Sequence, residues 1–323
     1  MFKVISYGEV LIDMLSNKLG SDHDNGQESF TKFPGGAPAN VAAAVSRLGG
    51  EGYFVGKIST DMFGQFLKKS LNAIGVKTDY VTYTDTESTA LAFVSLDENG
   101  ERSFEFYRDN TADMNYRISD FKTEWFEGNG IFHACSNTLT SKDTFKVTMA
   151  GLQMAKNNDW IVSFDVNLRI NLWAVDADPA SRIWQCLSHA NLIKFSKEEF
   201  EYLAGDDDEQ SVLAKIFQSA LLVLITDGGN PLRYFTKDGE GELLPPISDI
   251  VDSTAAGDAF VGGLLYSLAK DQVTASDLEN FKVSSPELEN ALRFASRCGA
   301  YTVTKKGAFT ALADQDDLKK MDF

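Results

Sequence analysis

Hydrophobic and polar positions alternate in blocks along this chain, and the blocks predict short strands separated by helices. The segment "FKVISY" at 2–7 predicts a buried strand that ends at Gly8. Pro38 and the glycines at 49–50 bound a predicted helix, because proline favours a first turn and glycine favours an end. A second helix is predicted after Asp61, which can cap it, with apolar residues at helical spacing: Phe63, Phe66, Leu67, Leu71 and Ile74.

The same alternation continues through most of the remaining chain. Strands that alternate with helices are typical of a mostly parallel sheet with helices on both faces. The predicted strands lie at 52–58, 130–135, 160–166, 191–196 and 220–229, and the predicted helices lie near 142–157, 178–188, 197–203 and 260–268.

Two segments break this pattern and predict a small β appendage. In the segment 88–108, aromatic and acidic residues alternate near 104–106, and Asn99-Gly100 is a strong hairpin signal, so we predict an antiparallel ribbon. The segment near 11–34 is largely polar and rich in turn residues. We therefore predict one α/β domain over residues 1–323, with an appendage built from these two insertions.

Charge narrows the classes of partner. The chain carries 47 Asp and Glu against 30 Lys and Arg, a formal net charge of −17. So acidic a surface repels the phosphates of nucleic acids and anionic lipids, which leaves small molecules as the expected partners. Small anions are not excluded, because local backbone dipoles can outweigh the overall charge.

The cysteines and histidines show no metal-binding pattern. They are scattered, with no CxxC spacing, which predicts reduced core cysteines and structural or surface histidines: Cys135, Cys186, Cys298, His23, His133 and His189. The N-terminus lacks the apolar segment and cleavage site of a signal peptide, and no apolar run reaches membrane-spanning length. We therefore expect a cytoplasmic protein.

The segment "VDSTAAGDAF" at 251–260 carries the clearest chemical signal. Small residues precede one acid, Asp258, and an apolar helix follows. Small residues let an anion approach the unpaired N–H groups at the helix start. No Lys or Arg stands in this segment, so we predict that the positive helix end is the partner of Asp258. An acid beside a bound phosphoryl group can take a proton from an attacking hydroxyl, as phosphoryl transfer requires.

A structural interpretation of the same segment stays open at this point. Ser253 or Thr254 could cap the helix, with Asp258 an exposed first-turn acid that contributes only about 0.3–1 kcal/mol through the dipole.

Several motifs together resemble the ribokinase/PfkB family of carbohydrate kinases. "DSTAAGDAF" resembles the C-terminal signature of that family and "FPGGAPANVAAAVSRLGG" the N-terminal one. The likeness extends in order through "GEVLIDM", "ERSFEFYRDNTADM", "FDVNLRINLW", "FSKEEFEYLAG" and "CGAYTVTKKGA", and it is greatest to the fructokinase branch. The resemblance implies a three-layer α/β/α sandwich with a β-sheet lid. It also implies ATP-dependent phosphorylation of free fructose, with Mg²⁺ and K⁺ as cofactors.

The resemblance also implies a role for particular residues. Asp258 would be the catalytic base, assisted by an anion hole at Ala255, Ala256 and Gly257 and by Arg169. The sugar would contact Asp13, Gly35, Gly36, Asn40, Phe106, Arg108 and Asn167, with Asp165 nearby. The nucleotide would contact Thr226, Gly228, Gly229 and Ser296. Glu199 would support Mg²⁺ through water, and Asp252, Thr254, Val303 and Gly307 would surround a monovalent cation.

Four positions depart from the family pattern. Ala255 replaces the commoner glycine of the anion hole, Ser196 replaces the asparagine of N-x-x-E, and Pro231 replaces the last glycine of the nucleotide loop. Ala311 stands where many relatives have a serine near the monovalent cation.

The sequence lacks the motifs of two other classes of nucleotide-binding enzyme. The fragment "EGYFVGKI" has Glu51 and Ile58 where a P-loop needs Gly and Ser or Thr, and no G-x-G-x-x-G follows the first strand. The remaining alternatives are a kinase for a 2-keto-3-deoxy sugar acid, ribose or a riboside, and a non-catalytic sugar sensor. The ribbon has an apolar face, so we also expect lid closure and a homodimer through the lid.

Overall fold

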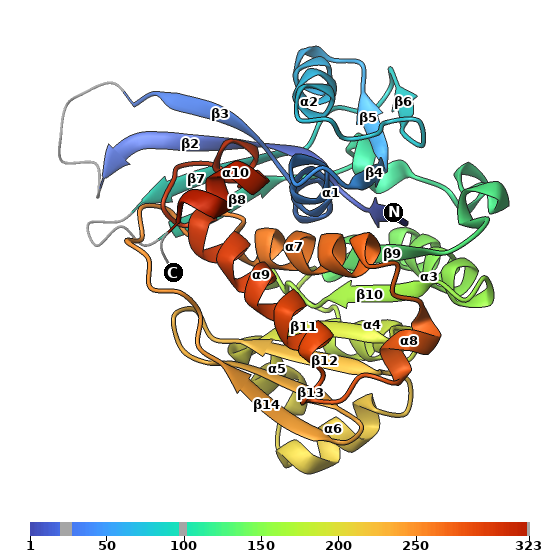
Figure 1. Ribbon diagram of the computed structural model, residues 1–323. Helices are drawn as coiled ribbons and strands as arrows, with labels where there is room; N and C mark the ends of the chain where they lie inside the picture. The colour runs from blue at the N-terminus through green and yellow to red at the C-terminus, as the bar shows by residue number, and fades with distance from the viewer. Residues whose placement is uncertain (20–27, 97–101, 322–323) are drawn as a thin grey trace.

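The computed structural model describes residues 1–19, 28–96 and 102–321, and its largest feature is an eight-stranded sheet (Figure 1). The strand order is β14-β13-β12-β11-β10-β9-β1-β4, in which the six strands from β12 to β4 are parallel. The other two form an antiparallel hairpin at one edge. The strands are β1 (Lys3–Tyr7), β4 (Glu51–Val55), β9 (Gly130–Cys135), β10 (Ile161–Asp165), β11 (Leu192–Ser196), β12 (Leu222–Thr226), β13 (Leu232–Thr236) and β14 (Gly239–Leu243).

Two hydrophobic cores lie on opposite faces of this sheet. Successive strand residues point to opposite faces, so Val4 belongs to one core and Ile5 to the other. The first core contains residues of α1 (Ala37–Arg47), α7 (Ala256–Lys270), α8 (Ala275–Glu279), α9 (Pro286–Thr302) and α10 (Gln315–Lys320). The second contains residues of α3 (Lys142–Asn157), α4 (Pro179–Leu187), α5 (Lys197–Ala204) and α6 (Glu209–Ile216).

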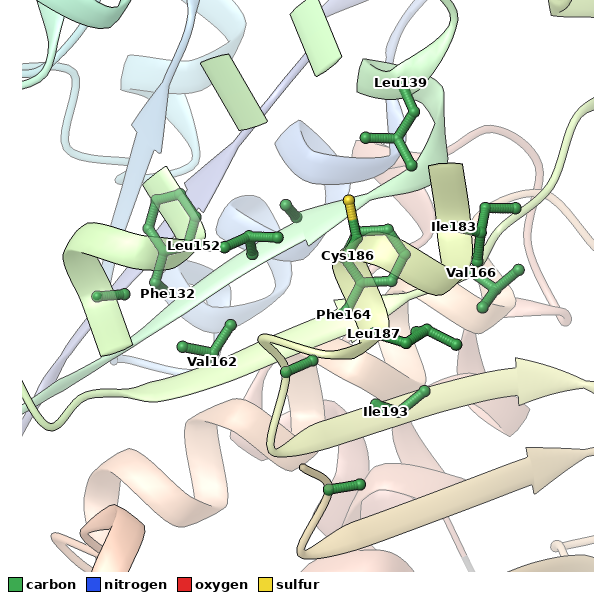
Figure 2. Close-up of a cluster of buried hydrophobic side chains, with 14 of the residues drawn as sticks. Phe132, Leu139, Leu152, Val162, Phe164, Val166, Ile183, Cys186, Leu187 and Ile193 are labelled. Carbon is green, nitrogen blue, oxygen red and sulfur yellow. The ribbon is translucent and has the colours of Figure 1, made fainter. Parts of the chain in front are cut away.

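Figure 2 shows part of the second core, where Phe132 and Phe164 of the sheet lie among Leu152 of α3 and Cys186 of α4. With helices on both faces of a mostly parallel sheet, the predicted three-layer α/β/α fold is confirmed. The predicted helix at 142–157 and the predicted strands at 130–135 and 191–196 also agree with the structure.

A separate four-stranded sheet is built from the two predicted insertions. Its order is β3-β2-β7-β8. The pairs β2–β3 and β7–β8 are antiparallel, and the parallel pair β2–β7 joins them. The predicted Asn99-Gly100 turn and His23 lie outside the described residues. The strands are β2 (Leu11–Leu19), β3 (Phe30–Gly35), β7 (Leu91–Leu96) and β8 (Arg102–Tyr107).

One predicted strand is divided. The expected strand at 52–58 separates at Gly56 into β4 and β5 (Lys57–Ser59), and β5 pairs with β6 (Thr82–Thr84). A Cβ on Gly56 would lie 2.5 Å from the carbonyl oxygen of Gly8, so the chain bends where the two backbones meet. The other elements are α2 (Met62–Ala73) and short 3₁₀ turns η1 (Ala112–Asn115), η2 (Ile118–Asp120), η3 (Thr123–Phe126), η4 (Ser136–Leu139), η5 (Ile170–Leu172) and η6 (Phe309–Ala311).

Within the described ranges, none of the helices combines the length and the apolar character that crossing a membrane would require.

Candidate active site

Helix α7 begins without a side-chain cap. Its N-cap residue, Ala255, has φ 59° and ψ 12°, the left-handed conformation, and makes no capping hydrogen bond. The interpretation that Ser253 or Thr254 caps this helix is therefore wrong. The first N–H groups of a helix have no acceptor within it, and the helix dipole makes this end positive. The N–H of Ala256 donates to the Ser253 carbonyl oxygen at 3.3 Å, so an anion such as a phosphoryl group fits the N–H groups of Gly257 and Asp258.

Asp258 is buried beside this helix end, not exposed as the structural interpretation supposed. Its Oδ2 accepts a hydrogen bond of 2.7 Å from Nδ2 of Asn40. Burial raises the pKa of Asp258 to about 7, an effect that the Asn40 hydrogen bond opposes and the charge of Asp165 reinforces. A carboxyl group with a pKa near neutrality suits a general base.

The helix end is not the only positive partner of Asp258. Arg169 and Lys194 both lower its pKa through their charges, although neither is near it in sequence. The prediction based on the local segment alone was therefore incomplete, because the fold brings these cations from the loop after β10 and from β11.

Asn40 links the predicted sugar loop to the predicted base. It lies in the first turn of α1, follows the Gly35-Gly36 pair and is buried. Its Nδ2 is used by Asp258, whereas its buried Oδ1 has no hydrogen-bond partner in the part of the chain that the structure describes. The free amide oxygen can accept a hydrogen bond from a substrate hydroxyl.

The glycine pair allows close packing around this loop. A Cβ on Gly35 would lie 2.0 Å from Oδ2 of Asp13, which stands on the adjacent strand β2. Gly36 has φ 103°, and a Cβ there would lie 2.6 Å from the Glu9 carbonyl oxygen. Both positions therefore require glycine, and Gly35 brings Asp13 against the loop that holds Asn40.

Arg108, at the end of β8, lies in a buried polar cluster. Its Nε is 2.6 Å from Oδ2 of Asp113, and its Nη1 donates to the Asn137 carbonyl oxygen at 2.8 Å. The Asn137 amide in turn donates to Oε1 of Glu9 at 3.0 Å, and Glu9 also accepts from the backbone N–H of Ala37. Glu9, Asp113 and Asn137 were not among the predicted site residues, although Asp113 follows Arg108 closely in sequence.

Phe106 precedes this arginine on the small sheet. It packs against the buried cluster of Leu11, Ala90 and Ala92, and its ring stacks on that of Phe104 with centroids 6.0 Å apart.

Asp165, at the end of β10, and Lys194, in the middle of the adjacent strand β11, form a buried ion pair. They are direct partners in the parallel register of β10 and β11, and Nζ of Lys194 lies 3.0 Å from Oδ1 of Asp165. Lys194 was not among the predicted site residues, because a single lysine within an apolar strand gives no signal of its own. The register, which the sequence does not reveal, creates the pair.

Glu199 has an evident structural role. Its two carboxylate oxygens accept hydrogen bonds from the backbone N–H groups of Leu168, at 2.8 Å, and Ser196, at 2.7 Å. Ser196 caps α5 in return, so the two residues form a capping box. The first of these bonds also fixes the loop after β10, which holds Asn167, buried and with φ 36°, and Arg169.

A cavity of ≈ 510 Å³ extends from the open end of α7 to the turn after β12. All four predicted nucleotide residues line it, together with Ala256 and Gly257 of the predicted anion hole: Thr226, Gly228, Gly229 and Ser296. Its size falls within the range of about 300–1,000 Å³ for small-molecule sites. The site thus offers room for a nucleotide whose phosphates would reach the start of α7.

The four residues predicted around a monovalent cation also come together. The Asp252 carboxylate accepts hydrogen bonds from the backbone N–H groups of Thr254, at 2.7 Å, and Gly307, at 2.9 Å. The Val303 carbonyl accepts from the backbone N–H groups of Val251 and Asp252. The group lies directly before the left-handed N-cap of α7, so it helps to fix the turn that leaves the helix end open.

Comparisons with known proteins agree with this geometry. Residues 1–315 match the pfkB family carbohydrate kinases. The chain is 39% identical over 312 residues to fructokinase-2 of Oryza sativa subsp. japonica, covering 96% of this chain and 90% of that protein. It is 44% identical to a crystal structure of fructokinase with bound ATP from Xylella fastidiosa, with a TM-score of 0.92 and coverage of 98% and 97% of the two chains.

A further similar structure is a fructokinase double mutant from Vibrio cholerae O395 in a form with fructose, ADP and potassium ion bound. It is 32% identical, with a TM-score of 0.85 and coverage of 99% and 97%. The family match spans nearly the whole chain, and the predicted nucleotide residues line one cavity together with Ala256 and Gly257 of the predicted anion hole. This chain belongs to the pfkB family of carbohydrate kinases.

Proposed function

We infer that this protein transfers the γ-phosphoryl group of ATP to the primary hydroxyl of free D-fructose, giving fructose 6-phosphate. The observation that carries this proposal is the position of Asp258: it is buried, hydrogen-bonded to Asn40 of the glycine-pair loop, and in the first turn of an uncapped helix. The fructokinase relatives support the choice of fructose.

The chemistry follows from these neighbours. The sugar hydroxyl gives its proton to the Asp258 carboxylate while its oxygen bonds to the γ-phosphorus. The bond from that phosphorus to the oxygen bridging it to the β-phosphate breaks, and the electron pair leaves on ADP. The backbone N–H groups of Gly257 and Asp258 face the charge of the moving phosphoryl group, where preorganised dipoles are most effective.

The donor atoms fit Mg²⁺ and K⁺. Each Glu199 oxygen accepts one backbone hydrogen bond and keeps a further lone pair, and Mg²⁺ retains several waters when it binds phosphates, so Glu199 would hold it through water. The Asp252 carboxylate and the carbonyls of Thr254 and Gly307 are oxygen donors that would hold K⁺. When bound, Mg²⁺ would supply charge to neutralise the phosphates.

We further propose that the four-stranded sheet is a lid on a single domain and that it pairs with the lid of a second copy. Three aromatic rings support pairing: Phe93 makes edge contacts with Phe30 and Tyr107, at 5.2 and 5.4 Å, and the side chain of Tyr107 is 56% exposed. Sedimentation with and without fructose tests this, and a monomer under both conditions would reject the dimer.

We also propose a cytoplasmic location.

A panel of free sugars with ATP tests the substrate. Formation of ADP would be followed by a coupled assay and the product identified by ³¹P NMR. Fructose should give the highest kcat/KM. Turnover of ribose, a riboside or a 2-keto-3-deoxy sugar acid, with none of fructose, would replace the substrate and keep the kinase. Sugar binding without ADP formation would indicate a sensor.

A further inference from the structure

The nucleotide cavity has little positive charge for its expected ligand. The chain has a net charge of −17, and among the described residues that line the ≈ 510 Å³ cavity, Lys194 is the one Lys or Arg. A nucleoside triphosphate carries several negative charges into this space. Backbone dipoles at the start of α7 meet part of that charge, and the position of Lys194 indicates a second source.

The Lys194 ammonium lies at the open helix end. A Cβ built on Gly257 would be 3.4 Å from Nζ of Lys194, so the ammonium is directly beside the first turn of α7. The side chain is only 7% exposed, and its charge acts on Asp258. One buried cation therefore contacts both the predicted anion hole and the wall of the nucleotide cavity.

Stability alone does not explain a lysine here. A buried ion pair often contributes nothing net to folding, because removing two charges from water costs about as much as their attraction returns. Asp165 is at the carboxyl end of β10 and holds Nζ at 3.0 Å from its Oδ1. A carboxylate so placed keeps the ammonium charged and fixes its direction, which is what a phosphate contact requires.

We propose that Lys194 binds the γ-phosphoryl group of ATP, and that Asp165 positions it. This inference rests on the proposed use of ATP and not on which sugar accepts the phosphate. Lys194 donates N–H hydrogen bonds to γ-phosphoryl oxygens and keeps its proton throughout. ADP lacks that group, so Lys194 makes the site discriminate between the triphosphate and the diphosphate.

The test measures binding of two nucleotides by calorimetry without sugar: ADP and the non-hydrolysable triphosphate adenylyl imidodiphosphate, each with Mg²⁺. In Lys194→Met, affinity for the triphosphate should fall about 10–100-fold more than affinity for ADP, the effect of a lost hydrogen bond to a charged group. Lys197→Met is the matched control, because Lys197 is an exposed lysine that pairs with Asp227. It should leave the ratio of the two affinities unchanged.

The single variant leaves Asp165 buried without its cation, so the double variant Lys194→Met/Asp165→Asn is measured beside it. Removing both charges avoids an unpaired buried carboxylate, and the double variant should show the same loss of discrimination. An unchanged ratio in the folded single or double variant would overturn the proposal. Failure of the wild-type protein to bind either nucleotide would instead reject the proposed kinase function.

Discussion

Helices α5 and α7 both begin beside the nucleotide cavity, and each has an acid three residues after its N-cap, Glu199 in α5 and Asp258 in α7. In α5 the acid and Ser196 satisfy each other's backbone N–H groups in a capping box. In α7 the N-cap is a left-handed alanine with no capping bond, and the acid is bound by Asn40 from another segment.

The difference separates a capped helix end, whose acid would reach Mg²⁺ only through water, from an uncapped one proposed to face the reacting phosphoryl group. Glu199 uses both carboxylate oxygens on backbone donors, so substituting the α5 cap should mainly affect folding. Asp258 lies in the first turn of an uncapped helix, and its burial disfavours the charged carboxylate. Substitution of Asp258 in α7 should therefore lower turnover, whereas substitution of the α5 cap should lower stability.

The largest effect is expected from Asp258→Asn. The amide keeps the size of the side chain and can still accept the hydrogen bond from Asn40, but it cannot take a proton. The value of kcat should fall about 10²–10⁴-fold, while affinity for ADP should remain within a few-fold of wild type. Steady-state rates with fructose and ATP measure this. Turnover within a few-fold of wild type would contradict the role of Asp258 as base.

The same variant should be more stable than the wild type above pH 7. The pKa of Asp258 is about 7 in the folded protein and about 3.9 when unfolded. The stability that protonated Asp258 gives the wild type therefore decreases as the pH rises between these two pKa values. This contribution is fully lost above pH 7. Melting temperatures from pH 4 to 8.5 should show a growing advantage for D258N. Asp208→Asn, at the exposed cap of α6, should show no such gain.

A second, smaller effect is expected from Asn40→Ala. The variant removes the 2.7 Å hydrogen bond that lowers the pKa of Asp258, and it removes the proposed hydroxyl acceptor. The kcat/KM for fructose should fall about 10–100-fold, and the pH at which the rate declines should move upward. A large loss with an unmoved pH profile would mean that Asn40 acts on the sugar alone.

Ser196→Ala should affect the capped helix differently. Loss of the N-cap hydroxyl costs about 0.5–2 kcal/mol of stability, so the melting temperature should fall while kcat stays within a few-fold of wild type. Thermal unfolding and initial rates on one preparation measure both. A drop in kcat larger than the drop at Asn40→Ala would show that α5 takes part in the chemistry and would remove the contrast between the helices.

The smallest effect is expected from Ala255→Gly. Glycine removes the strain of a left-handed alanine, which raises the free energy of unfolding by about 1–2 kcal/mol. The greater freedom of glycine in the unfolded chain lowers it by about 0.5–1 kcal/mol. Stability should therefore rise by about 0–1.5 kcal/mol, with turnover nearly constant. A tenfold change in kcat would mean that the methyl group shapes the anion hole.

Local patterns predicted the fold well wherever the hydrophobic residues of an element repeat with one clear period. The apolar runs of β9 and β11 and the periodic helix α3 follow from sequence alone. The family resemblance predicted a shared site for Asp258 and Asn40, which are hydrogen-bonded in the structure. The hairpin β13–β14 was not predicted: "GEGEL" of β14 has neither an apolar run nor strong β formers, although "LRYFT" of β13 does contain strong β formers. Helix α9 was also missed, although its apolar residues have helical spacing after Pro286.

The contacts that set the electrostatics could not be predicted. Lys194 and Asp165 are far apart in sequence, and only the register of two parallel strands makes them partners. The pKa of Asp258 likewise depends on burial between α1 and the sheet, which no local pattern reports. The sequence therefore singled out Asp258, but not the environment that raises its pKa.

The pH dependence of kcat/KM for fructose tests the central claim most directly, because that parameter reports the ionisation of the free enzyme. Rates would be measured from pH 5.5 to 9 with Mg²⁺ and ATP. With Asp258 as the base and a pKa of about 7, kcat/KM should be constant above that pH and fall about tenfold per unit below it. A profile that stays flat down to pH 5.5 would contradict the account, because an ordinary exposed aspartate remains ionised there.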